Sequence, residues 1–148
     1  MIIIKYYTAL FLLIVMTIAN GSELNIVSNE LKIDRENEIS IFKGNVYAIS
    51  ETFKIWSDEL IVLSEGNKNK VKEIIAVDNV KIIKDNITAK GEKGLYNPNA
   101  NVLTLLFNVE VYENGNLVKC DKLVLDLKNS TSIMTSEADN KVEALFIN

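Results

Sequence analysis

The pattern that most constrains this chain is the alternation of apolar and polar residues with a period of two. From Glu23 onward it recurs in short runs such as Val80-Lys81-Ile82 and Leu123-Val124-Leu125-Asp126-Leu127. β-Branched residues are frequent in these runs, and clusters of polar turn residues separate them. No convincing apolar stripe with a period of 3.6 residues accompanies them. The alternation therefore predicts an all-β domain.

One turn is specified by its residue types. Asn114-Gly115 lies between two alternating segments. Both central positions of a type I′ turn need a positive φ, which Asn and Gly tolerate. We therefore expect a tight hairpin that joins Val109–Tyr112 to Leu117–Cys120.

An internal repeat is visible in three copies. Each copy opens with an Asn-Val pair, at Asn45-Val46, Asn79-Val80 and Asn108-Val109. We interpret each pair as the start of a strand, and each copy as one hairpin. A single hairpin cannot bury its apolar face in water, so the copies are expected to share one core.

The first residues have the character of a targeting segment. Lys5 precedes an uncharged stretch from Tyr6 to Ile18, and small residues flank Asn20. This stretch is short for a bilayer span, which takes about 20 apolar residues. We predict that residues 1–21 form a signal peptide cleaved near Gly21/Ser22, and that residues 22–148 form one exported domain. Because Ile2, Ile3 and Ile4 could lengthen the apolar stretch, an uncleaved membrane anchor stays open.

Composition excludes several classes of function. The chain has no histidine and a single cysteine, so His-dependent catalysis, His-bearing zinc sites and disulfide frameworks cannot be built. The net charge of -4 argues against nucleic-acid binding. No acid pair stands on a recognisable catalytic frame, as glycoside hydrolysis would need. We expect a non-enzymatic protein without a cofactor or a metal site.

The alternation also assigns faces to the strands. Lys81, Glu110, Lys122 and Asp126 fall on the wet face. The dry face carries, from N- to C-terminus, Val46, Ala48, Val80, Ile82, Val109, Val111, Leu123, Leu125 and Leu127. The pattern alone does not distinguish a packed core from a slot that holds a ligand.

Several segments together resemble the OstA-like (LptA) family. They are Gly44-Asn45-Val46, the strand Ser57-Asp58-Glu59-Leu60-Ile61-Val62, the strand Ala89 to Tyr96 with Gly94-Leu95, and Cys120-Asp121-Lys122-Leu123. The likeness extends from Leu24 to about Met134. It departs from the family at Cys120, where a glycine or another small residue is usual.

The resemblance implies an open β-jelly roll of antiparallel strands in the periplasm. Its interior would hold the acyl chains of lipid A, the membrane anchor of lipopolysaccharide. The residues expected to line this interior are Leu24, Ile26, Val46, Ala48, Val80, Ile82, Val109, Val111, Leu123 and Leu125.

The resemblance also implies a bridge between inner-membrane and outer-membrane transport complexes. Expected partners are LptC-like and LptD-like jelly-roll domains, and copies of the chain could join head to tail. An unclosed sheet leaves unpaired backbone groups at its edges, which invite another strand. We expect these edges at Leu31 and Ile33 and at Val142, Ala144 and Phe146. Two alternatives stay open: a membrane-anchored LptC-like component and a ligand-free structural β-domain.

Overall fold

The computed structural model describes residues 14–17, 23–66 and 70–147, which form one antiparallel β-sheet. Within these residues, no helix is long and apolar enough to span a membrane. The predicted all-β class is confirmed. The strands are β1 (Ile14–Thr17), β2 (Glu23–Val27), β3 (Glu30–Asp34), β4 (Ile39–Ile49), β5 (Lys54–Glu65), β6 (Lys70–Lys84), β7 (Ile87–Asn97), β8 (Val102–Glu113), β9 (Asn116–Asp126), β10 (Thr131–Thr135) and β11 (Glu143–Leu145).

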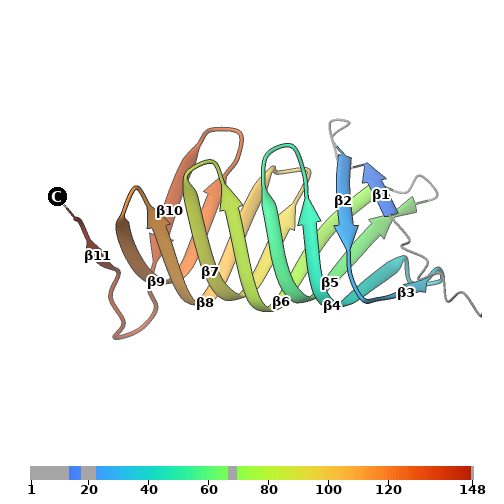
Figure 1. Ribbon diagram of the computed structural model, residues 1–148, viewed down its shortest axis with the longest axis horizontal. Helices are drawn as coiled ribbons and strands as arrows, with labels where there is room; N and C mark the ends of the chain where they lie inside the picture. Colours follow the sequence, from blue (N-terminus) through green and yellow to red (C-terminus); the bar gives the residue numbers. More distant parts are fainter. Residues whose placement is uncertain (1–13, 18–22, 67–69, 148) are drawn as a thin grey trace, which may run out of the picture.

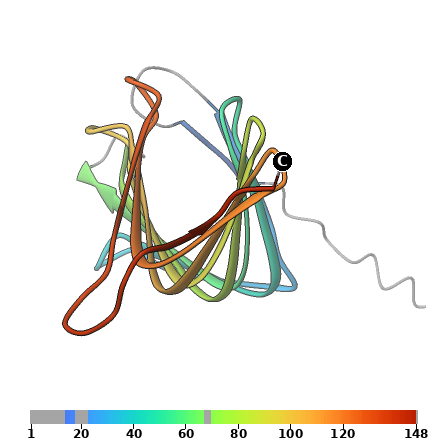
Figure 2. The ribbon, with the colours of Figure 1, turned by 90° about the vertical axis from the view of Figure 1, so that its left-hand side faces the viewer.

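The strands follow one another along the long axis of the molecule (Figure 1). Their order in the sheet is β1-β2-β4-β5-β6-β7-β8-β9-β10, while β3 pairs with β4 and β11 pairs with β9. Among the described strands, the first and the last do not pair with each other, so the sheet is an open roll. Seen along the axis, the sheet bends into two walls that face each other (Figure 2).

The bend passes through the middle of the long strands. β4, β6 and β8 each carry two residues with positive φ at this point, where neighbouring strands shift register by one residue. An extra residue of this kind is a β-bulge, which bends a strand sharply. We call these three bulges the corner line; they are Gly44-Asn45, Asp78-Asn79 and Phe107-Asn108.

The corner line divides the sheet into two named walls. Wall A consists of β3, β10 and residues 39–43, 59–65, 70–77, 93–97, 102–106 and 122–126. Wall B consists of β2, β11 and residues 46–49, 54–57, 80–84, 87–91, 109–113 and 116–120. The mouth is the side of the roll opposite the corner line, where the hairpin turns of both walls lie (Figure 2).

The interpretation of the Asn-Val pairs as strand starts is wrong. Asn45, Asn79 and Asn108 lie inside long strands, at φ of 47°, 50° and 50°. Asn adopts the left-handed region more readily than most residues because its short polar side chain can form local hydrogen bonds. The repeat therefore marks the corners of the sheet, and the valine after each Asn resumes the strand on wall B.

The hairpin prediction at Asn114-Gly115 is confirmed. Both residues have positive φ, of 51° and 81°, and Glu113 pairs with Asn116 across the turn. The strands it joins are β8 and β9, which extend beyond the predicted segments and over the corner line.

The outermost strands are interrupted where the inner strands bend. β2 and β3 both pair with β4, on either side of Gly44 and Asn45. At the other end of the sheet, β10 and β11 both pair with β9, on either side of Cys120 and Asp121. At each end of the roll, two short strands thus take the place of one long strand, and one of them extends wall A while the other extends wall B.

Most of the predicted signal peptide lies outside the described residues. Of residues 1–21, the structure describes Ile14–Thr17, whose backbone pairs with β2. Cleavage near Gly21/Ser22 stays a prediction, and it would remove this strand from the edge of wall B.

Candidate functional site

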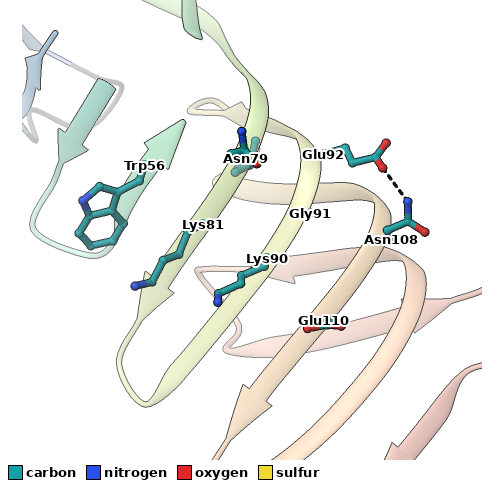
Figure 3. A pocket seen from close by; sticks show the side chains of 9 residues that line it. Trp56, Asn79, Lys81, Lys90, Gly91, Glu92, Asn108 and Glu110 are labelled. Carbon is teal, nitrogen blue, oxygen red and sulfur yellow. Dashed lines mark hydrogen bonds between the residues drawn. The ribbon is translucent and has the colours of Figure 1, made fainter. Parts of the chain in front are cut away.

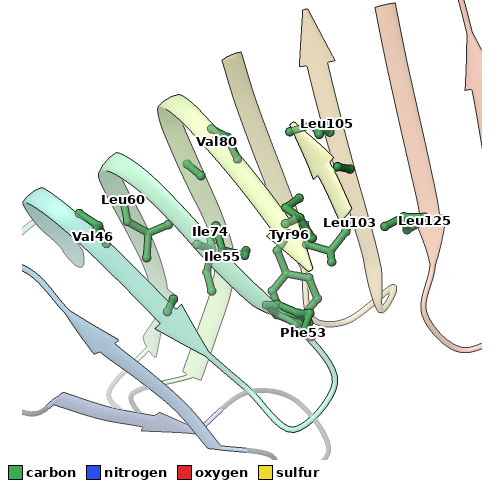
Figure 4. Close-up of a cluster of buried hydrophobic side chains, with 14 of the residues drawn as sticks. Val46, Phe53, Ile55, Leu60, Ile74, Val80, Tyr96, Leu103, Leu105 and Leu125 are labelled. Atoms are coloured by element: carbon green, nitrogen blue, oxygen red, sulfur yellow. The ribbon is translucent and has the colours of Figure 1, made fainter. Parts of the chain in front are cut away.

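The interior between the walls contains every residue predicted to line it. All ten side chains are at most 3% exposed. Leu123 and Leu125 lie on wall A, and the other eight lie on wall B. Val46, Val80 and Leu125 are labelled in Figure 4. Contact between these residues and a lipid stays a prediction.

Sequence reasoning missed most of wall A. Its further buried side chains are Phe42, Leu60, Val62, Val71, Ile74, Ala76, Tyr96, Leu103 and Leu105. Alternation within each half strand could have found them, as in Leu103-x-Leu105 and Leu60-x-Val62. However, the inward face of one half strand does not predict the inward face of the other half, because the extra residue at the corner reverses the alternation.

β5 illustrates the change of parity. Ile55 and Ser57 point inward before the corner, and Leu60 and Val62 point inward after it. Trp56 shares parity with Leu60 but lies on the outer face, between its cross-strand partners Tyr47 and Lys81. It is therefore not a core aromatic.

The interior is almost wholly apolar. Among the described residues, its buried polar side chains are Ser40 and Ser57, and the Ser57 hydroxyl donates to the Glu59 carbonyl at 2.9 Å. The buried titratable groups are those of Tyr96 and Cys120, and burial raises the pKa of both. At neutral pH both stay uncharged. This environment suits hydrocarbon and offers no charged group to a polar ligand.

The walls touch each other near the corner line. A Cβ on Gly91 of wall B would lie 2.8 Å from Cγ of Leu105 on wall A. A Cβ on Gly94 of wall A would lie 3.2 Å from Cγ1 of Val80 on wall B. Any larger residue at Gly91 would push the walls apart, so glycine permits their close approach.

The walls also touch at the mouth, through two aromatic rings. Phe53, in the turn between β4 and β5, meets Tyr96, near the end of β7 (Figure 4). The ring centroids are 4.7 Å apart and the planes are inclined by 62°. Edge-to-face pairs of this kind contribute about 0.5–1.5 kcal/mol beyond the area that they bury.

The sheet edges carry the residues predicted to meet partners. Leu31 packs against the core from β3, whereas Ile33 on the same strand is exposed. At the other end, Val142 and Ala144 are exposed, and Phe146 is 71% exposed. In the described part of the chain, β3 pairs only with β4, and β11 pairs only with β9.

A hollow of about 540 Å³ lies on the outside of wall B beside the corner line (Figure 3). Lys81 and Glu110 line it, in agreement with their predicted outward orientation. Trp56 closes one side, and the Lys81 Nζ lies 5.1 Å from its ring centroid. Asn108 donates to Glu92 at 2.6 Å in the same hollow. No group of three or more His, Cys, Asp or Glu residues in the described ranges could hold a metal ion.

Comparison with known proteins places the fold among lipopolysaccharide transport proteins. The model of the family described as "LptA/(LptD N-terminal domain) LPS transport protein" matches residues 25–131. The crystal structure of LptH, the LptA homologous periplasmic component of the lipopolysaccharide transport device from Pseudomonas aeruginosa, superposes with a TM-score of 0.73. The two chains are 12% identical, and the match covers 84% of this chain and 95% of LptH. No curated protein sequence matches significantly.

Proposed function

Because this chain belongs to the LptA/LptD N-terminal domain family of lipopolysaccharide transport proteins, we propose that it carries lipopolysaccharide through the periplasm. The acyl chains of lipid A lie between the two walls, and the sugars stay outside. The observation that carries this proposal is an apolar interior lined from both walls in an open roll.

The acyl chains are the part of lipopolysaccharide whose burial contributes most to the binding free energy. Burial of a CH₂ group gains about 0.8 kcal/mol, so an acyl chain of a dozen carbons gains about 10 kcal/mol before ordering costs. Affinity from apolar area needs no basic cleft. The net charge of -4 is therefore compatible with an anionic lipid.

Transport further requires that lipid pass between neighbouring proteins. The exposed edge strands β3 and β11 support strand addition by LptC-like and LptD-like jelly-roll domains, or by further copies of this chain. Joined end to end, such rolls form a bridge between the inner-membrane and outer-membrane complexes. The sequence has no Gly-x4-Gly-Lys-Ser/Thr loop, so we expect a nucleotide-driven partner to supply the energy.

Photo-crosslinking in cells that make lipopolysaccharide tests the lipid site. A photoreactive residue at Val80 or Val111, both buried, should form lipid adducts. The same residue at Glu110, on the outside of wall B, should form none. Equal labelling at all three positions would contradict an interior site. No labelling of a folded protein would instead favour a structural domain filled by its own side chains.

Sedimentation tests the joining of edge strands. Phe146→Asp places a charge beside the exposed edge of β11 and should reduce head-to-tail association of purified protein at high concentration. Phe107→Asp is the matched control, because Phe107 is equally an exposed Phe but lies on the corner line in β8, which β9 separates from β11. Association unaffected by Phe146→Asp would remove this segment from the proposed interface.

The N-terminal sequence of the exported protein separates a soluble bridge, starting near Ser22, from an anchored LptC-like form.

A further inference from the structure

One aromatic contact joins the two sides of the roll at its mouth. Phe53 lies in the turn that joins two strands of wall B, Tyr96 belongs to wall A, and the two residues are 2% and 3% exposed. Both residues are thus buried at the rim, where their rings are in contact. The pair therefore joins wall A to a turn of wall B at the mouth.

The turn that carries Phe53 is a self-contained unit. The Ser50 Oγ accepts hydrogen bonds from the backbone N–H groups of Thr52 and Phe53, at 3.2 and 3.1 Å. The Ser50 N–H donates to the Phe53 carbonyl at 2.9 Å. Phe53 lies outside both β4 and β5, so its ring can move with the turn while the sheet stays paired.

Tyr96 is placed more rigidly than Phe53. It lies within the sheet, where it pairs with Ile74 on one side and Leu103 on the other. The turn that follows is closed by the Asn97 Oδ1, which accepts from the Ala100 N–H at 3.1 Å. Phe53 is therefore the movable partner of the pair.

Between the two ends of the roll, the corner line offers no entry route. Near the corner line the walls are in contact at Gly91 and Leu105, where an added Cβ would meet Cγ at 2.8 Å. The corner hydrogen bonds, such as that from Asn79 to Asp58 at 2.7 Å, hold the bend from outside. Hydrocarbon that enters from the side of the roll, and not through its ends, must part the walls at the mouth.

We propose that Phe53 and Tyr96 form a latch that opens to admit an acyl chain into the interior. This inference rests on the proposed function, since it assigns the entry route of the same lipid. The closed latch shields the apolar interior when no lipid is bound. On opening, an acyl chain replaces the contact between the two rings, with the bend at the corner line as the pivot.

A crosslink across the latch tests the inference. In a Cys120→Ala background, Phe53→Cys and Tyr96→Cys are joined by dibromobimane, which spans two nearby thiols. Binding of radiolabelled lipopolysaccharide by the purified protein is measured before and after crosslinking. We expect at least a tenfold loss of binding on crosslinking. Thr104→Cys with Val124→Cys is the control, because these cross-strand partners lie on one wall and their crosslink leaves the mouth free.

The possible outcomes separate the latch from the proposed function. Equal binding before and after crosslinking at Phe53 and Tyr96 would overturn the latch and leave lipid binding standing. Failure of the unmodified protein to bind would overturn the proposed function, and the latch with it. Loss of binding at the latch pair alone supports both.

A single substitution gives a second measure. Phe53→Ala should raise the rate of lipid uptake roughly two- to tenfold, since it removes one ring of the pair. Tyr47→Ala is the matched control, because Tyr47 also belongs to an aromatic pair, with Trp56 at 4.9 Å between ring centroids, but on the outer face of the sheet. Uptake that is accelerated equally by both variants would point to general loosening of the sheet and overturn the latch.

Discussion

The Nδ2 of Asn79 in β6 donates to the Oδ2 of Asp58 in β5 at 2.7 Å, across the bend of the sheet. The same relationship recurs two strands further on, between β8 and β7, where Asn108 donates to Glu92 at 2.6 Å. It recurs again where Asn140, between β10 and β11, donates to Asp121 at 3.1 Å. Each bond joins an Asn to an acid of the neighbouring strand. The outside of the bend is thus stabilised by repeated Asn–carboxylate contacts.

Asn79→Ala should destabilise the fold by about 1–2 kcal/mol for two reasons. It removes the hydrogen bond to Asp58, and it puts an alanine, which has no polar side chain to stabilise a left-handed backbone, at φ 50°. Asn79→Gly removes the same bond but tolerates the backbone, so it should cost less. Urea unfolding of the two variants measures the difference. Equal stabilities would show that the backbone conformation is unimportant at this corner.

Gly91→Ala tests the close approach of the walls. The added methyl would lie 2.8 Å from Leu105, so we expect a loss of about 1–3 kcal/mol from overpacking. Gly94→Ala should reduce stability less, because its added methyl group would lie 3.2 Å from its nearest neighbour, the Val80 side chain. In a double-mutant cycle, Gly91→Ala with Leu105→Ala should be less destabilising than the sum of the single changes. Additive effects would mean that the two residues do not meet.

Acid should release the segment between β10 and β11. A hydrogen bond from the Glu137 N–H, followed by one from the Asn140 amide, lowers the pKa of the Asp121 carboxyl. A lowered pKa in the folded state means that the contact stabilises the segment above the ordinary carboxyl pKa. That stabilisation is lost as the pH falls through the lowered value.

NMR chemical shifts of the Glu137 amide should follow this titration. In Asp121→Asn the acid-dependent change should disappear, while the Asp126 carboxyl, which is held by Asn129, should still titrate. A Glu137 shift that persists in Asp121→Asn would assign the titration to another group.

Local rules predicted the parts of this fold that depend on a few neighbouring residues. Alternation placed Val109 and Val111 inside and Glu110 outside, and residue types placed the turn at Asn114-Gly115. These features follow from the pleat of a strand and from φ preferences, which do not need the rest of the chain.

The bend was harder to predict, because a bulge breaks the period on which strand reasoning depends. Ser57 and Leu60 both point inward although three positions separate them. Gly44-Asn45 and Asp78-Asn79 are turn-like pairs inside otherwise regular strands, and that combination is a usable signal for a bulge. The latch could not be predicted, because Phe53 and Tyr96 meet only after the sheet has folded over.

Phe107 is the exception among the corner residues and gives the last prediction. It occupies the first bulge position at φ 68°, where β4 has Gly44 and β6 has Asp78. A bulky side chain is strained in this region, and the Phe107 ring is 54% exposed, so burial offsets little of that strain. Phe107→Asn should therefore raise the free energy of unfolding by about 0.5–1 kcal/mol. The reciprocal change, Asp78→Phe, should lower it, and both are measured by urea unfolding. A loss of stability in Phe107→Asn would mean that the ring makes contacts which outweigh the strain of its backbone.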